Sequence, residues 1–310
     1  MHPGALGDVL QAIPALRTLG RRARITFAGQ PRLARLLADT GVVERALAFD
    51  TLGLEALFSP EPLPAAVRER LSRFDLLVSW FGSRDETYAQ RLRTLAAACV
   101  VASPVGAESG GPVWRHLCHT IESGDITARE LERLAVPDAW RRVARTHLGE
   151  LGVDPNRRLL LIHPGAGGAA KLWPAERFAQ VIRHALTGTD DVELLVHQGP
   201  ADREVVERLL PRLDARVLRL VEPELSLLAG ILADAAAYLG VDSGVSQLAA
   251  ATGCRATILY PAGTFERWTP WSSTALALRA DSPTERIAIA VSERLRHRAP
   301  WPSTTRGRVE

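Results

Sequence analysis

Short runs of apolar, β-branched residues alternate along this chain with segments of helical periodicity. That alternation is typical of parallel sheets covered by helices on both faces, so it predicts an α/β fold. Strands are predicted at 24–29, 74–81, 99–102, 159–163, 192–197, 216–221, 236–241 and 256–260. Helices are predicted at 8–19, 31–40, 63–73, 85–97, 174–187, 202–213, 225–233, 244–252 and 283–298.

The length of 310 residues is enough for two domains with separate cores. The boundary is expected near 137–157, where a charged helix begins at Asp138 and a turn then precedes a new strand. We therefore expect an N-terminal domain of residues 1–150 and a C-terminal domain of residues 151–298. The tail 299–310 is expected to be disordered, and residues 103–136 to be irregular.

The composition excludes several classes of protein. Hydrophobic residues make up 46% and charged residues 24%, as in ordinary globular proteins, and no apolar run approaches the roughly 20 residues that cross a bilayer. The N-terminus has no signal-peptide pattern, which indicates a cytoplasmic protein. Three cysteines without a CxxC pair argue against disulfides and zinc, and we expect no metal site. No basic stripe with interleaved aromatics supports nucleic-acid binding.

One lysine stands out in the charge pattern. Of 38 basic residues, Lys171 is the single lysine and the rest are arginines. A compact ammonium with three rotatable donors suits a diphosphate differently from a planar guanidinium, so Lys171 is a candidate phosphate ligand. The alternative is a surface lysine without a role.

Three glycine-containing loops precede predicted helices, at residues 3–8, 164–171 and 242–244. Each supplies what an anion needs, namely close backbone approach, free N–H groups and the positive end of a helix dipole. In open parallel sheets such loops lie at the carboxyl ends of the strands, where ligands bind.

The second loop is the richest of the three. Gly165 and Ala166 are among the small residues that let a phosphate come close, and Lys171 stands just ahead of the helix predicted at Pro174. The loop is not a Walker A motif, because no Ser or Thr follows the lysine. The chain has no GxGxxG signature either, which disfavours a hydride-transfer cofactor.

Several polar residues at these loops also fit the role of a helix cap. Asp8 precedes an apolar helix start, and Asp242 or Ser243 could cap the helix that ends before Gly253. Asp202 fits by position either a ribose ligand or a helix N-cap. The residues alone leave these pairs of interpretations open.

Three motifs together resemble glycosyltransferase family 9, the heptosyltransferase-like group. They are Gly4-Ala5-Leu6-Gly7-Asp8-Val9, then His163-Pro164-Gly165-Ala166-Gly167 with Lys171-Leu172-Trp173-Pro174, then Gly240-Val241-Asp242-Ser243-Gly244-Val245-Ser246. The resemblance runs over nearly the whole chain, in the family's order and spacing. It implies a GT-B fold, with two Rossmann-like domains whose parallel sheets face across a cleft, the acceptor held by the first and the nucleotide donor by the second.

The resemblance also implies a reaction. It is an inverting, metal-independent transfer of a heptose from ADP-heptose to a lipopolysaccharide-type or other glycolipid acceptor, with no cofactor besides the nucleotide sugar. The enzyme is expected to be a cytoplasmic monomer, peripheral at the inner face of the bacterial inner membrane. The motifs assign Asp8 as general base, with Gly4 and Gly7 in its loop, and Lys171 to the diphosphate. Donor contacts are expected from Gly165, Ala166, Asp202, Asp242, Ser243, Gly244, Gln247 and Thr264.

The chain departs from the family pattern at three places. Only Met1 and His2 precede the first loop, so we expect either a misassigned start or a first domain without its central strand. Gln247 replaces the usual histidine and can bond a phosphate or ribose oxygen but cannot carry charge. Thr264 follows Pro261-Ala262-Gly263 in place of the usual Gly-Pro-Thr order. The nearby segment 267–271 is predicted either to stack on a base or sugar, or only to pack.

Two rival functions fit the same residues. A sugar-nucleotide epimerase on the same architecture would release an isomerised sugar without an acceptor, but further acid and base residues are not identifiable. A catalytically silent nucleotide-binding module is suggested by Gln247 and the short N-terminus.

Overall fold

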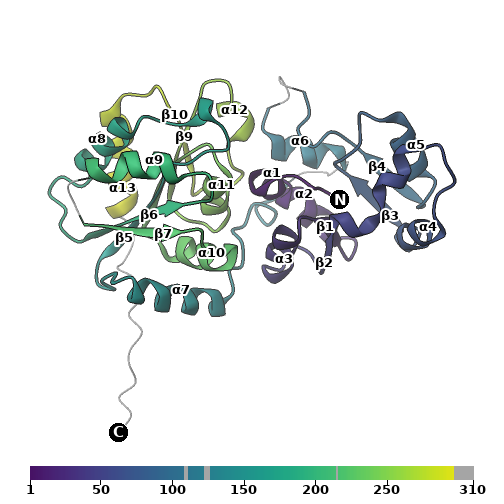
Figure 1. Cartoon of the computed structure of the whole chain (residues 1–310), viewed down its shortest axis with the longest axis horizontal. Helices are drawn as coiled ribbons and strands as arrows, with labels where there is room; N and C mark the ends of the chain where they lie inside the picture. Colours follow the sequence, from purple (N-terminus) through teal and green to yellow (C-terminus); the bar gives the residue numbers. More distant parts are fainter. Residues whose placement is uncertain (108–110, 122–125, 214–215, 297–310) are drawn as a thin grey trace, which may run out of the picture. The chain divides into compact units, whose positions relative to one another are not determined.

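The computed structural model describes residues 1–107, 111–121, 126–213 and 216–296 (Figure 1). The chain forms two compact units, Met1–Glu132 and Arg133–Glu310. The predicted tail at 299–310 and parts of the predicted irregular segment lie outside the described residues. Among the described residues, no helix is long and apolar enough to cross a membrane.

The boundary between the units lies ahead of the expected one at 150/151 because of one helix. Helix α7 (Asp138–Glu150) packs on α10 (Leu225–Asp234) of the second unit. Arg141 and Arg145 form ion pairs with the buried Asp234 at 2.9 and 3.0 Å. A Cβ on Gly230 would lie 2.5 Å from the Trp140 carbonyl oxygen, so the two helices approach closely. These contacts make α7 part of the second unit.

The second unit contains a six-stranded sheet in the order β10-β9-β8-β5-β6-β7, with every pair parallel. The strands are β5 (Arg158–His163), β6 (Val192–Gln198), β7 (Val217–Val221), β8 (Ala237–Val241), β9 (Ala256–Tyr260) and β10 (Leu276–Arg279). The first five were predicted. Edge strand β10 was not, because its sequence Leu-Ala-Leu-Arg has no β-branched residue.

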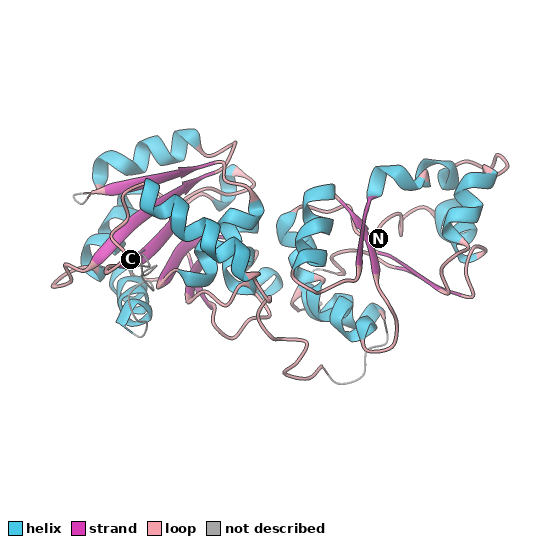
Figure 2. Cartoon of the chain, turned by 90° about the horizontal axis from the view of Figure 1, so that it is seen from below, coloured by secondary structure: helices cyan, strands magenta, loops and turns pink. Residues whose placement is uncertain are grey.

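Helices cover both faces of this sheet (Figure 2). One layer contains α8 (Ala175–Ala185), α9 (Arg203–Leu209) and α13 (Thr284–Arg296), and the other contains α7, α10 and α11 (Gly244–Ala251). Short helices η3 (Ala169–Lys171), η4 (Leu210–Arg212) and α12 (Phe265–Trp268) complete the unit. The four central strands are almost wholly buried, as expected for parallel strands covered twice.

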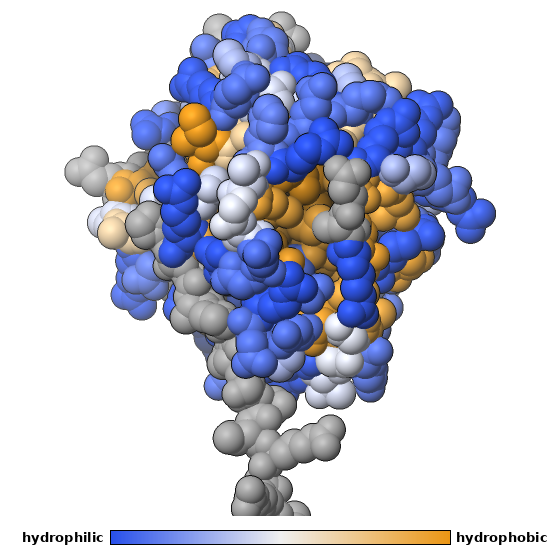
Figure 3. Space-filling view, turned by 90° about the vertical axis from the view of Figure 1, so that its left-hand side faces the viewer, coloured by the Kyte–Doolittle hydropathy of each residue, from blue (hydrophilic) through white to orange (hydrophobic). Residues whose placement is uncertain are grey.

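The surface of the second unit is mostly hydrophilic, with an apolar area on the face drawn in Figure 3. Among its described residues, the exposed large apolar side chains are Val143, Leu172, Val221 and Ile289.

The first unit contains two parallel strand pairs, β1 (Thr26–Gly29) with β2 (Arg45–Ala48) and β3 (Leu76–Ser79) with β4 (Ala98–Val101). Its helices are α1 (Leu6–Gln11), α2 (Ile13–Gly20), α3 (Pro31–Asp39), η1 (Phe49–Leu52), η2 (Leu54–Phe58), α4 (Ala65–Leu71), α5 (Glu86–Arg93) and α6 (Val113–Thr120). Three of the strands were predicted, and the exposed β2 was missed.

The first two residues of the chain lie between β1 and β3. The Met1 amine donates to the Val78 carbonyl at 2.7 Å, and the Met1 carbonyl accepts from Trp80 N–H at 3.0 Å. On the other side, His2 N–H donates to the Ala28 carbonyl at 2.9 Å. Met1 and His2 thus bond to both β1 and β3 and join the two strand pairs.

Two predictions for the first unit need correction. The helix predicted at 8–19 breaks at Ala12, because Pro14 lacks the N–H that a continuous helix would use. The segment predicted to be irregular contains α6, which buries Trp114 and Leu117 and receives the Gln11 side chain at the Trp114 N–H, 3.1 Å away.

Candidate functional site

The strand order of the second unit indicates where a ligand would bind. Strand order reverses between β5 and β8, since β6 and β7 lie beyond β5 and β9 and β10 lie beyond β8. In a doubly wound sheet the ligand crevice opens at this switch point, outside the carboxyl ends of the strands. The loops that follow β5 and β8 are the two that the sequence singled out, residues 164–171 and 242–244.

An ion pair joins these two loops. Lys171 Nζ lies 2.9 Å from Asp242 Oδ2, with the lysine side chain 33% exposed and the carboxylate nearly buried. The ammonium also lies 5.7 Å from the centre of the Trp268 ring, within cation–π range. The chain's single lysine is thus held beside the switch point, with one side still open to solvent.

The loop after β5 presents its backbone to solvent. Residues 167–170 are exposed, and a Cβ at Gly167 or Gly168 would meet nothing within 4 Å. Ala166, by contrast, packs on the core of the unit. The loop ends in η3, which carries Lys171, and Trp173 then anchors it by donating its indole N–H to the Ala280 carbonyl at 2.9 Å.

The loop after β8 is fixed by hydroxyl groups. Ser243 is the N-cap of α11, and its Oγ accepts from Ser246 N–H at 3.2 Å. Ser246 Oγ donates to the Val241 carbonyl and lies 2.8 Å from Tyr238 Oη, which passes over the bare Gly240. Of the two residues expected as possible caps, Asp242 and Ser243, the structure has Ser243 as the cap, and Gly244 is the first residue of α11. The amino end of α11 is thereby positioned beside Asp242.

Gln247 bonds to protein groups. Its side-chain amide donates to the Trp268 carbonyl at 2.6 Å and to Tyr260 Oη at 3.3 Å, and the residue is buried. Thr264 is the N-cap residue of α12, the short helix that ends in Trp268. Gln247 thus holds Trp268 in place near Lys171. Sequence spacing could not reveal this contact, because the bond is to a backbone carbonyl 21 residues away.

Asp202, in the loop after β6, lies against the loop after β5. It occupies the N-cap position of α9, but its side chain makes no bond that caps the helix. Instead Oδ2 accepts from Gly199 N–H at 2.7 Å, and the carboxylate lies so close to Gly165 that a Cβ there would be 2.0 Å from Oδ1. A side chain at position 165 would overlap the Asp202 carboxylate, so the carboxylate can occupy this place only beside a glycine.

A buried histidine pair beside Asp202 was not among the sequence candidates. His163 Nδ1 and His197 Nδ1 lie 3.0 Å apart, and His163 Nδ1 lies 3.9 Å from Asp202 Oδ2. Burial lowers the pKa of His163 to about 4 and that of His197 to about 3. Both rings are therefore neutral near pH 7, one donating and one accepting through Nδ1. The signal was available, since both residues lie at the carboxyl ends of adjacent strands.

These three side chains also form the one group of possible metal ligands among the described residues, with ligand atoms within 4.8 Å of one another. Two imidazoles and a carboxylate are donors that zinc and iron accept. Here the two Nδ1 atoms bond each other, and Asp202 Oδ2 accepts from Gly199 N–H. The contacts fit a hydrogen-bonded network.

Asp8 lies in the first unit, on α1. It occupies the third helical position, and its Oδ2 accepts from Ala5 N–H at 2.9 Å, so it closes the first turn without being the N-cap residue. A Cβ on Gly4 would lie 2.8 Å from Asp8 Cβ and 2.6 Å from the His2 ring, which explains the glycine there. Gln30 steadies the loop by donating to the Gly4 carbonyl at 3.1 Å. Gly7 lies within α1.

Comparisons with known proteins bear on the family and the fold. Residues 111–290 match the family model described as glycosyltransferase family 9 (heptosyltransferase). No curated protein sequence matches the chain.

Three solved structures are similar over almost the whole chain. A glycosyltransferase family 9 protein from Veillonella parvula DSM 2008 is 16% identical, covers 95% of each chain and has a TM-score of 0.75. The E. coli ADP-heptose lps heptosyltransferase II is 16% identical, with 94% of this chain and 96% of that chain covered and a TM-score of 0.68. The E. coli heptosyltransferase WaaC with ADP is 19% identical, with 94% and 96% covered and a TM-score of 0.60. These similarities show a GT-B fold.

Proposed function

Because this chain belongs to glycosyltransferase family 9 and is a glycosyltransferase, we propose that it transfers a heptose from ADP-heptose to a lipopolysaccharide-type glycolipid acceptor. The family description names heptosyltransferases, and two of the similar structures are named as such, one of them holding ADP. Among the residues themselves, the observation that carries the proposal is the ion pair of Lys171 with Asp242 at the switch point of the second sheet.

Lys171 is proposed to bind the donor diphosphate. In the free protein its charge is balanced by Asp242, and the exposed third of the side chain leaves room for a phosphate oxygen on the other side. Small exposed residues at 167–170 let the diphosphate approach the backbone, and the amino end of α11 adds partial positive charge. Asp242 would keep the ammonium oriented, so that binding the donor requires little rearrangement.

Trp268 is proposed as a flat wall beside the donor. Its ring already lies against the Lys171 ammonium, and its backbone carbonyl is held by Gln247 and Tyr260. Because the Trp268 backbone is held in this way, the side chain loses less conformational freedom when a base or sugar stacks on its ring. Gln247 would then influence donor binding through Trp268, without touching the phosphate.

Asp8 is proposed to act as the general base. Its carboxylate would accept the proton of the acceptor hydroxyl as that oxygen forms a bond to the anomeric carbon and the bond from that carbon to the ADP oxygen breaks. Attack opposite the leaving group inverts the anomeric configuration. The negative charge that develops on ADP would be stabilised by Lys171 and the α11 amino end, and we propose that no metal is needed for this step.

The acceptor and cellular setting follow from the same proposal. A lipid-linked acceptor would place the enzyme at the inner face of the bacterial inner membrane, as a peripheral protein that works as a monomer. Mass spectrometry of reactions with ADP-heptose, other nucleotide sugars and a panel of lipid-linked acceptors would test it. The expected product is the acceptor plus one heptose, formed in the presence of EDTA. Consumption of the donor without a glycosylated product would contradict the proposal.

A further inference from the structure

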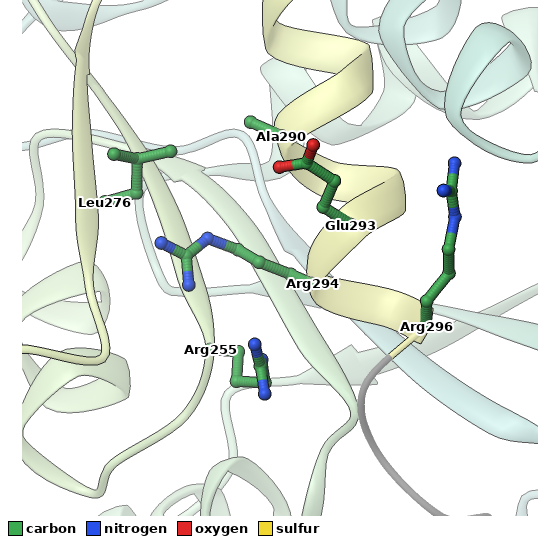
Figure 4. Close-up of a pocket in the computed structure, with 6 residues that line it drawn as sticks. All are labelled: Arg255, Leu276, Ala290, Glu293, Arg294 and Arg296. Atoms are coloured by element: carbon green, nitrogen blue, oxygen red, sulfur yellow. The ribbon is translucent and has the colours of Figure 1, made fainter.

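A cavity lies at the end of the sheet away from the proposed donor loops. It has a volume of about 360 Å³ and is lined by Arg255, Leu276, Ala290, Glu293, Arg294 and Arg296 (Figure 4). Arg255 precedes β9 and Leu276 begins β10, so the cavity lies at the amino ends of these strands. The donor loops follow the carboxyl ends, and the five residues of β9 alone extend about 16 Å.

The charge of the cavity is unbalanced. Three arginines line it against one glutamate, a net charge of +2. Among the described residues, neither Arg255 nor Arg294 has a carboxylate within ion-pair distance. Figure 4 shows Arg294 extending from α13 toward the strands, with the Arg255 guanidinium below it. The Glu293 carboxylate points toward neither guanidinium.

Both arginines also have buried N–H groups that the described residues do not use. Arg255 Nε and Arg294 Nε are inaccessible to solvent and have no hydrogen-bond partner among the described residues. Arg294 is held in place by a bond from Nη1 to the Thr274 carbonyl, 2.9 Å away. Burial, and then the neighbouring Arg255, lower the pKa of Arg294, so the two cations disfavour each other. An unpaired, partly desolvated cation pair lowers stability unless an anion completes it.

We propose that this cavity binds the phosphate group of a small phosphorylated solute, with Arg255 and Arg294 as its charged donors. Guanidinium groups match the geometry of phosphate oxygens and form strong charge-assisted bonds with them. The volume exceeds that of phosphate alone and lies at the lower end of the range for small-molecule sites, which fits a phosphomonoester of sugar size. The cavity is separate from the donor loops, so the inference does not depend on the proposed function.

Titration calorimetry with inorganic phosphate tests this inference. The full chain is used, at constant ionic strength kept by potassium chloride. The wild type should bind phosphate, and Arg255→Gln and Arg294→Gln should each weaken binding by about tenfold or more. Arg286→Gln removes an exposed arginine from the same helix and should leave the affinity unchanged. Lys171→Met should also leave it unchanged, which separates this cavity from the donor site.

A second measurement covers the case in which Arg294→Gln loses its support from Thr274 and does not fold. Phosphate should raise the melting temperature of the wild type and of Arg286→Gln but not that of Arg255→Gln, which keeps the Thr274 bond. Absence of binding by the wild type at millimolar phosphate would overturn the inference. Binding that Lys171→Met removes and Arg255→Gln does not would overturn it as well.

Discussion

Acidification from pH 7 to pH 5 is expected to destabilise the second unit through His163 and His197. Burial lowers the pKa of the two rings to about 4 and about 3, whereas an unfolded histidine titrates near pH 6.5. Between these values the unfolded chain binds protons that the folded protein excludes. Stability therefore falls as pH drops below 6.5 and continues to fall until the folded pKa is reached.

The size of the effect follows from the pH interval. Both folded pKa values lie below pH 5. The stability contributed by each histidine therefore falls over the whole interval from its unfolded pKa to pH 5, about 1.5 pH units. At about 1.4 kcal/mol per unit, each contributes roughly 2 kcal/mol between pH 7 and pH 5, and the pair roughly 4 kcal/mol. The Asp202 carboxylate, 3.9 Å from His163 Nδ1, raises the pKa of His197 and so reduces the loss of stability on acidification.

Urea unfolding at the two pH values measures the effect. The double variant His163→Asn/His197→Asn keeps a polar atom near each Nδ1 position but cannot titrate, so its stability should fall much less than that of the wild type. His184→Asn, an exposed histidine on α8, is the matched control and should behave like the wild type. Equal pH dependence in the double variant and the wild type would refute the assignment of the effect to this pair.

Three further substitutions test other parts of the account. Asp8→Asn should lower kcat for transfer by about 100-fold or more without changing ADP affinity, since it removes only the proposed base; full activity in a product assay would rule out that role. Arg21→Gln should lower the urea midpoint of the first unit, because the buried Glu130, whose pKa Arg21 lowers to about 2, loses its cationic partner and keeps only the bonds from Thr127; an unchanged midpoint would show the ion pair to be dispensable. Gly165→Ala should lower the stability by about 1–3 kcal/mol and weaken ADP binding, because its Cβ has no space, while Gly167→Ala should leave the stability unchanged in the same melts; equal effects on stability would contradict the packing argument.

The sequence predicted the elements that carry strong local signals. Buried central strands such as β5 and β8 have nearly continuous apolar runs, and helices after glycine loops have clear starts. Strands β2 and β10 were missed because both lie at sheet edges and lack β-branched residues. The pairing of Met1 and His2 with two strands was out of reach, because a two-residue segment has no periodicity to detect.

For the site, residue type and loop position singled out Lys171, the family resemblance added Asp242, and the structure brings the two together. Their contact depends on strand order, which the hydrophobic pattern does not encode. Asp202 and Gln247 were expected to be donor contacts, yet Asp202 bonds to Gly199 within its own loop and Gln247 bonds to the Trp268 carbonyl. Side-chain direction depends on tertiary contacts, so local sequence could not distinguish a ligand from a residue that supports one.

Titration of ADP into the wild type and Lys171→Met tests the central claim, that the switch point of the second unit binds the donor diphosphate. Loss of one charged contact should weaken ADP binding by about 10- to 100-fold. Arg208→Gln, which removes an exposed cation paired with Glu204 on α9, should bind ADP as the wild type does. Equal affinity of Lys171→Met and the wild type would contradict the claim.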